Sequence, residues 1–188
     1  MPFGRRFAAL GIALLLGLAA PAARAAELEA PRGPVVVTVG GNIQHTNRGP
    51  FDPDQDLFLK YHERSFTRAA AFDRAMLEGL GLHAVTIALQ GWPDPVTLEG
   101  PYLRDLVAAV GGAGRTVTLV ALDGYGSEIS WADLQGLDWI VGLRQDGRPL
   151  GLGQRGPLWV VYTYPDGRAL TMEDEGRWPW ATFYIEIE

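Results

Sequence analysis

A tryptophan on a tight turn is the first residue whose type and position suggest chemistry. Trp92 lies in the sequence Gly91-Trp92-Pro93, directly after an apolar run from Ala84 to Leu89. A large indole on a turn bounded by glycine and proline is poorly placed for a core and well placed to stack on a flat ligand. The alternative is that Trp92 covers the turn, as tryptophans often cover the edge of a core.

Other familiar reactive patterns lack the context that their chemistry needs. Residues 151–156 match the pattern G-x-G-x-x-G, but a run rich in Trp, Val and Tyr follows them instead of a helix. A dinucleotide site needs a helix that opens inside the glycines. Ser127 has no G-x-S-x-G elbow around it. His45, His62 and His83 fall on different elements without the spacing of zinc ligands.

The chain has 188 residues and no cysteine. Disulfides, thiolate metal ligands and thiol nucleophiles are therefore excluded. Arg5 and Arg6 precede an uncharged, mostly apolar stretch, residues 7–20, and Ala23-Arg24-Ala25 fits a cleavage site. This pattern predicts a signal peptide over residues 1–25, too short to span a bilayer, which takes about 20 apolar residues. We expect residues 26–188 to form one exported, periplasmic domain without membrane insertion.

The net charge of the chain argues against some classes of binding partner. Removal of the signal peptide leaves 13 basic against 22 acidic residues, a net charge of about −9. A strongly acidic surface repels phosphate backbones and anionic lipid headgroups. Nucleic acid and anionic membranes are therefore not expected as partners.

Periodicity and turn residues predict the secondary structure. Eight strands are expected, at residues 35–39, 57–61, 84–89, 96–100, 116–122, 139–143, 158–164 and 181–187. A first amphipathic helix is predicted from Thr67 to Leu80 and a second from Pro101 through Val110, with a short helical turn at 131–134 capped by Ser130. The predicted class is α+β, a mixed, mostly β core with two amphipathic helices.

These elements carry a resemblance. The segments PVTLEGPYLRDL, TVTLVALDGYGSEISWADL and GQRGPLWVVYTYP resemble small single-domain relatives of the sulfite-oxidase-type molybdopterin-binding domain family, over about Pro34 to Glu188. The resemblance implies a sulfite-oxidase-like molybdopterin-binding fold. In catalytic members a cysteine thiolate ligates molybdenum, and the resemblance places that position near Ala88, between Thr86 and Leu89. Thr86, Ala88 and Leu89 offer no soft ligand, so no molybdenum is expected. This favours a protein that is not an enzyme.

Some small relatives of this fold resemble periplasmic pterin-binding regulators, which implies a pterin ligand. A pterin needs an aromatic face to stack on and an acceptor, best a carboxylate, for its edge of N–H donors. Trp92 would supply the face, Asp123 would read the edge, and Tyr125 and Arg144 would contact the ring or its tail. Asn47 resembles an asparagine of those relatives. The alternatives are an Asx turn for Asp123, a solvated charge for Arg144 and a turn cap for Asn47.

Three functions follow as hypotheses. The first is an exported, non-catalytic pterin-binding protein that relays its ligand state to the outer domain of a membrane receptor. The long polar loop from Asn42 to Asp56 would contact that receptor, because loops of such length are often functional. The second is a molybdopterin-dependent oxidoreductase without a cysteine ligand to molybdenum. The third is an interaction module with no small ligand.

Overall fold

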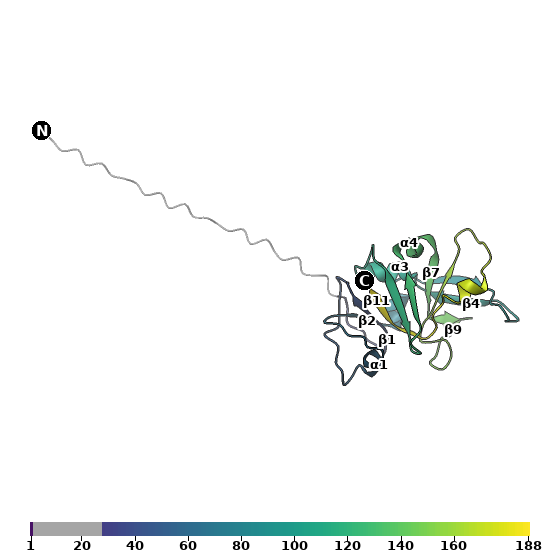
Figure 1. Ribbon diagram of the computed structural model, residues 1–188, viewed down its shortest axis with the longest axis horizontal. Helices are drawn as coiled ribbons and strands as arrows, with labels where there is room; N and C mark the ends of the chain where they lie inside the picture. The colour runs from purple at the N-terminus through teal and green to yellow at the C-terminus, as the bar shows by residue number, and fades with distance from the viewer. Residues whose placement is uncertain (2–27) are drawn as a thin grey trace.

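The computed structural model describes Met1 and residues 28–188 (Figure 1). Apart from Met1, the predicted signal peptide lies outside the described residues and stays a prediction. The described part combines sheets with short helices, and most of its regular structure is strand, which confirms the α+β class. None of its helices has the length and apolar character needed to cross a membrane.

The largest sheet brings the first and last strands of the described chain together. Its five strands lie in the order β2-β1-β11-β5-β6. Strands β1 and β11 run parallel and the other neighbours antiparallel. The bounds are β1 Val35–Gly41, β2 Ala70–Asp73, β5 Val117–Ala121, β6 Gly126–Ile129 and β11 Thr182–Ile187. The β-branched valines that open β1 favour its extended backbone.

A four-stranded sheet, β3-β4-β8-β9, and a two-stranded pair, β10-β7, make up the rest of the strand structure. The bounds are β3 His83–Ile87, β4 Val96–Gly100, β7 Asp138–Gly142, β8 Arg144–Gln145, β9 Arg148–Pro149 and β10 Trp159–Thr163. The chain after β4 meets β7 closely, because the Val141 N–H donates to the Pro101 carbonyl at 2.9 Å. This contact joins the smaller sheet to the β7–β10 pair.

The helices of the described chain are short. Their bounds are α1 Leu57–Tyr61, α2 Arg74–Glu78, α3 Leu103–Ala109, α4 Trp131–Gly136 and α5 Met172–Glu175. Helix α3 buries Leu103, Leu106 and Val107, which confirms its predicted apolar face. Ser130 caps α4 by accepting from the Asp133 N–H, as predicted. The predicted start of α3 at Pro101 is wrong, because the Pro101 carbonyl still pairs with β7 and the helix begins after Tyr102.

The predicted strand at residues 57–61 is wrong. These residues form helix α1, in which Leu59 is buried and Leu57 and Tyr61 are exposed. Leu59 packs with Val120 and Tyr184 in a small cluster of its own. A single helical turn is enough to place one side chain there, so the alternation of apolar residues did not reflect a half-buried strand.

The predicted helix from Thr67 to Leu80 is also wrong, and with it the expectation of two amphipathic helices. Residues 70–73 form β2, because their backbone pairs with β1 at the edge of the large sheet. Asp73 ends this strand and caps α2, accepting from the Met76 N–H at 2.9 Å. Long-range pairing therefore overrides the local helical pattern up to Asp73.

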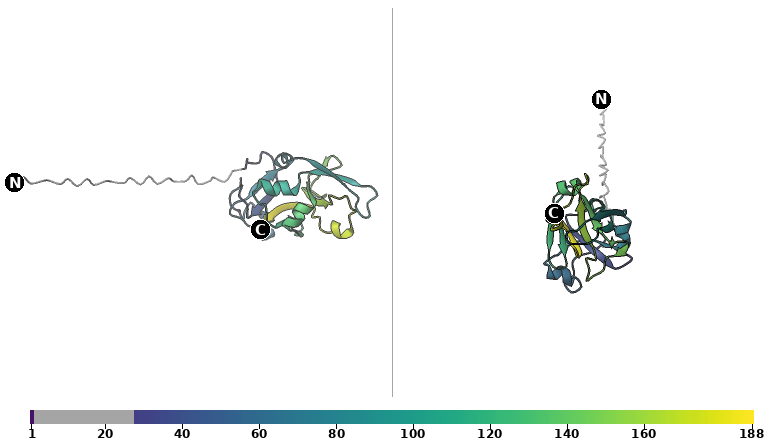
Figure 2. Two further views of the ribbon diagram at one scale, coloured as in Figure 1. Left: turned by 90° about the horizontal axis from the view of Figure 1, so that it is seen from above. Right: turned by 90° about the vertical axis from the view of Figure 1, so that its right-hand side faces the viewer.

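One main hydrophobic core connects the sheets to α3. It contains residues from both sheets, such as Val37, Leu98 and Ile185, together with Leu106 of α3 and Trp139 of β7. Figure 1 and the left view of Figure 2 place the connection between β3 and β4 at one end of the molecule, away from β1 and α1. That connection carries Trp92.

Candidate functional site

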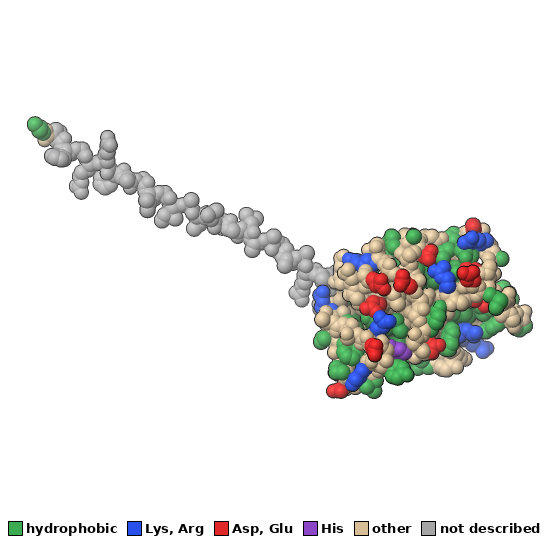
Figure 3. Space-filling model, viewed as in Figure 1, with side chains coloured by type: hydrophobic (Ala, Val, Ile, Leu, Met, Phe, Trp, Pro, Cys, Tyr) green, Lys and Arg blue, Asp and Glu red, His purple; other side chains and the backbone are tan. Residues whose placement is uncertain are grey.

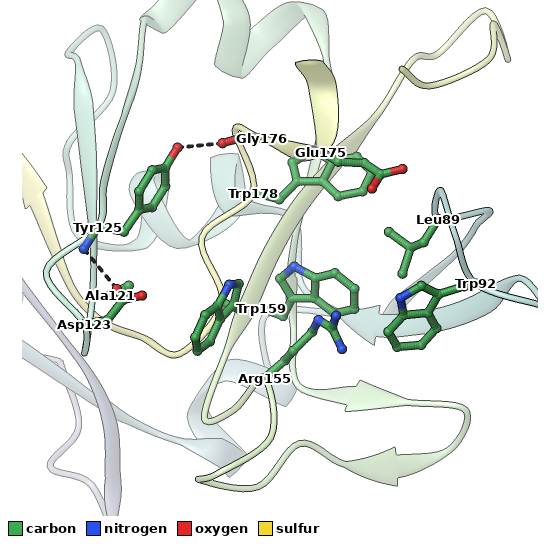
Figure 4. Close-up of a pocket in the computed structure, with 11 residues that line it drawn as sticks. Leu89, Trp92, Ala121, Asp123, Tyr125, Arg155, Trp159, Glu175, Gly176 and Trp178 are labelled. Atoms are coloured by element: carbon green, nitrogen blue, oxygen red, sulfur yellow. Dashed lines mark hydrogen bonds between the residues drawn. The ribbon is translucent and has the colours of Figure 1, made fainter. Parts of the chain in front are cut away.

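A cavity of about 340 Å³ opens where segments far apart in the sequence meet (Figure 4). Its walls come from the β3–β4 connection, the end of β5 with the turn after it, the chain entering β10, and α5 with the segment that follows. The lining residues are Leu89, Trp92, Ala121, Asp123, Tyr125, Arg155, Trp159, Glu175, Gly176, Trp178 and Trp180. Small-molecule sites occupy about 300–1,000 Å³, so the volume suits a small ligand.

Five aromatic side chains line the cavity. Trp159 and Trp178 are buried, whereas Trp92, Trp180 and Tyr125 are 37%, 46% and 43% exposed. The buried indoles belong to the main core and line the cavity as well. The exposed rings leave aromatic surface on which a flat ligand can stack.

The turn after β5 fixes Asp123 and Tyr125. An oxygen of the Asp123 carboxylate accepts from the Tyr125 N–H at 3.0 Å, and the intervening Gly124 has a φ of +89° that suits glycine. The Tyr125 hydroxyl donates to the Gly176 carbonyl at 2.7 Å. Asp123 therefore forms an Asx-type turn, and it also lines the cavity.

Helix α5 holds Glu175 against the β3–β4 connection. A Glu175 carboxylate oxygen accepts from the Gln90 N–H at 2.9 Å, which ties the loop that carries Trp92 to this helix. The neighbouring Asp174 is buried and accepts from the hydroxyls of Tyr162 at 2.5 Å and Tyr164 at 2.6 Å. Burial alone would raise the pKa of Asp174, but these hydrogen bonds and those from Thr171 hold it below its ordinary range.

Arg155 lies between two tryptophans of the wall. Its guanidinium carbon is 4.5 Å from the ring centroid of Trp92 and 4.7 Å from that of Trp159. Figure 4 shows the guanidinium in the space between these indoles. Burial lowers the pKa of Arg155 from its ordinary value. A cation thus lies against two of the indoles that line the cavity.

A second cavity, of about 420 Å³, adjoins the first. It shares Trp92 and Arg155 with the first cavity and continues over the β8–β9 hairpin. Its remaining lining residues are Gln145, Asp146, Arg148, Pro149, Leu150 and Gln154. The Trp92–Arg155 pair therefore lies at the boundary between two adjoining cavities, the first of which is lined by five aromatic residues and the second mostly by polar ones.

The comparisons with known proteins identify no family for the chain. A comparison with models of protein families finds no match, and a comparison with curated proteins finds no relative. The site therefore has to be interpreted from its own residues.

Three of the five residues predicted for the site lie together. Trp92, Asp123 and Tyr125 all line the first cavity. Arg144 is not among its lining residues, because its side chain turns toward α2 and donates to Glu78 at 2.7 Å. Asn47 is not among them either. Its amide group donates to the Ala71 carbonyl at 2.9 Å and accepts from the Ala71 N–H at 2.7 Å, so it fastens the loop after β1 to β2.

Sequence reasoning missed Arg155, Glu175 and the tryptophans at 159, 178 and 180. Trp159 and Trp178 belong to the buried core and also line the cavity, where Trp180 is exposed. Arg155 belongs to the glycine pattern at 151–156, which leads into β10 and not into a helix, as expected. The usable signal was an arginine within this glycine pattern, four residues before a strand that begins with a tryptophan.

The predicted scatter of the histidines is also observed. His45 and His62 each contact a backbone carbonyl, that of Ala109 at 2.8 Å and that of Leu122 at 3.2 Å, and His83 stacks on Tyr102. Among the described residues, no group of three or more His, Cys, Asp and Glu side chains is placed to hold a metal ion. The aromatic and charged side chains that line the first cavity are able to stack on a ligand and to form hydrogen bonds with it.

Proposed function

We propose that the chain is an exported, non-catalytic binding protein for a pterin, with the first cavity as its site. One observation carries the proposal: exposed aromatic rings and two carboxylates line the same cavity. A pterin is a flat heteroaromatic whose edge carries N–H donors like those of guanine. Rings such as Trp92 and Trp180 match its face, and Asp123 and Glu175 match its edge.

The carboxylates of Asp123 and Glu175 each use only one oxygen in a hydrogen bond to a described residue. Asp123 uses one oxygen for the Tyr125 N–H, and Glu175 uses one for the Gln90 N–H. No described residue donates to the second oxygen of either side chain. Because an ionised carboxylate accepts through both oxygens, each is able to bind an N–H donor of a ligand while keeping its structural hydrogen bond.

The proposal includes the finer fold and the location. We place the α+β architecture in the sulfite-oxidase-like molybdopterin-binding class, on the sequence segments that resemble it. We place the mature protein in the periplasm, on the predicted signal peptide. The absence of cysteine from the sequence supports binding over a thiolate-ligated molybdenum reaction.

Isothermal titration with oxidised and reduced pterins tests the function directly. We expect binding of at least one redox form, and a pterin absorbance and mass in protein purified from its own periplasm. A well-folded sample that gives no heat with any pterin would refute the proposal. Stoichiometric molybdenum in the purified protein would favour the oxidoreductase hypothesis instead.

Trp92→Ala is expected to weaken pterin binding at least tenfold. Stacking of a base on an aromatic side chain contributes roughly 1–3 kcal/mol, and 1.4 kcal/mol is one decade in Kd. Titration of both proteins, with thermal melts to confirm folding, measures the effect. Tyr61→Ala is the matched control, because Tyr61 is 82% exposed and does not line the cavity. Equal affinity in Trp92→Ala and wild type would remove Trp92 from the site.

We propose that the receptor contacts α1, and not the preceding loop from Asn42 to Asp56 that the sequence suggested. Asn47 and Arg48 are tied to the residue before β2, since the N–H groups of both donate to the Ala69 carbonyl. Leu57, Phe58 and Tyr61 are instead 62%, 61% and 82% exposed, and hydrophobic side chains gather over α1 (Figure 3). An exposed apolar cluster of this kind marks an interaction surface. We assign it to the outer domain of the membrane receptor.

Photo-cross-linking checks the receptor contact. A photoreactive amino acid at Phe58 is expected to give an adduct with an envelope membrane protein. The same amino acid at Leu82, which is 46% exposed at the start of β3, is expected to give none. Adducts from both positions, or from neither, would count against the surface over α1.

A further inference from the structure

We propose that Arg155 is an anion anchor, so that the ligand of this cavity is a pterin that carries an oxyanion, carboxylate or phosphate. This inference rests on the proposed function and specifies the ligand class within it. The ring would occupy the aromatic cavity, and the oxyanion would meet the guanidinium at the boundary with the second cavity.

Arg155 differs from the other half-buried arginines of the described chain, whose side chains form an ion pair or donate to a backbone carbonyl, as Arg74 and Arg115 do. Arg48, Arg64, Arg104, Arg144 and Arg177 each form an ion pair with an aspartate or glutamate. The guanidinium of Arg155 makes no hydrogen bond or ion pair to a described residue, although Asp123 and Glu175 line the same cavity. Its contacts are the two indole rings, which position the charge without satisfying its five N–H donors.

A partly buried cation without an acceptor has a free-energy cost that an anion would relieve. Burial lowers the pKa of Arg155, as expected for a charge withdrawn from water without a compensating partner. The planar guanidinium matches a carboxylate or phosphate with two parallel hydrogen bonds. The tryptophans hold the fork in place before the ligand arrives, so less side-chain freedom is lost on binding.

The second cavity provides room for the anionic substituent. It begins at the Trp92–Arg155 pair and is lined further by polar groups that include Gln154, Arg148 and Asp146. The negative charge of Asp146 disfavours an anion in this cavity, but one of its oxygens already accepts from the Thr97 N–H at 2.9 Å. A ring in the first cavity therefore directs its substituent past Arg155 and toward a second arginine.

Three pterins that differ at one position test the anchor. Titration of the wild-type protein with pterin-6-carboxylate, the phosphate monoester of 6-hydroxymethylpterin and neutral 6-methylpterin should give at least tenfold tighter binding for an anionic form. The tighter of the two anions identifies the oxyanion. Arg155→Met should abolish this preference. Arg155→Lys, which keeps the charge but not the planar fork, should retain only part of the preference.

The control separates local contact from net charge. Arg115→Met removes the same charge at the opposite end of β5, where Arg115 donates to the Gly111 carbonyl, and should keep the full preference. Equal wild-type affinities for all three pterins would overturn the anion anchor while leaving pterin binding intact. An unchanged preference in folded Arg155→Met, or in Arg155→Gln should the first variant not fold, would overturn it as well. If none of the pterins binds, the proposed function itself is wrong and the anchor with it.

Discussion

Replacing Gly100 by alanine is expected to unfold the protein, or to lower its free energy of unfolding by more than about 4 kcal/mol. A Cβ at this position would lie 1.9 Å from the Val141 carbonyl oxygen and 2.7 Å from the carbonyl carbon. Both atoms are backbone, and β7 cannot move away without breaking the hydrogen bonds from Val141 to Pro101 and from Leu143 to Glu99. The strain would fall on the contact between β4 and β7.

Chemical denaturation measures this effect. Gly136→Ala is the matched control, because a Cβ there meets nothing within 4 Å and Gly136 ends helix α4, where alanine is a better helix former. The control should match or slightly exceed wild-type stability. A folded Gly100→Ala protein of wild-type stability would mean that β4 and β7 do not approach as closely as described. Because β4 follows the loop that carries Trp92, the same variant should also lose ligand binding.

Asp174→Ala is expected to cost about 3 kcal/mol of stability. The buried carboxylate accepts from the hydroxyls of Tyr162 and Tyr164 and from the N–H and hydroxyl of Thr171, which it caps reciprocally at the start of α5. Its removal leaves buried hydroxyl donors without an acceptor, at about 1–3 kcal/mol each when no water replaces it, and removes the cap. Denaturation at pH 7 measures the loss.

The pH dependence of the same variant has a defined sign. Hydrogen bonds overcome the effect of burial and lower the pKa of Asp174 in the folded state. A depressed folded pKa contributes stability that is present above the unfolded value, about 3.9, and is lost as the pH falls toward the folded value. The wild-type protein should therefore lose stability below about pH 4, and Asp174→Ala should lose less over that range.

Two comparisons complete this prediction. Asp73 keeps some acid sensitivity in the variant, because hydrogen bonds from the backbone of Met76, Gly33 and Arg32 also lower its pKa. Glu173→Ala, an exposed change on the same helix, should stay close to wild type at pH 7. Identical acid profiles for Asp174→Ala and wild type would show that Asp174 titrates normally. Since α5 also carries Glu175, the loss of its cap should loosen the cavity wall.

Local patterns were sufficient wherever neighbouring residues decide the conformation. The β-branched runs of β1 and β5, the apolar face of α3 and the Ser130 cap are each encoded within a few residues, and each was predicted close to its observed bounds. The turn position of Trp92 and the Asp123 turn are local in the same sense. Trp92, Asp123 and Tyr125 line the cavity from loops between strands, and the predicted strand positions already defined where those loops lie.

The features that the sequence did not predict depend on contacts between segments that are distant along the chain. Residues 70–73 have a helical pattern and become β2 only because the edge of β1 is available to pair with them. Arg144 and Asn47 were predicted to contact the ligand. In the structure Arg144 instead pairs with Glu78, and Asn47 with the backbone of Ala71. A polar side chain binds whichever partner the fold places beside it, and the local sequence does not encode that partner.

Arg155 illustrates the same division most clearly. The sequence alone determined an α+β chain without a thiolate, with a tryptophan on the turn between two strands and a carboxylate after another. Only the tertiary structure brought Arg155 between Trp92 and Trp159 and placed Glu175 against Gln90. The physical reason is that the charge of an arginine acquires its role from the groups that surround it, and here those groups come from separate strands and loops that meet only when the sheets pack together.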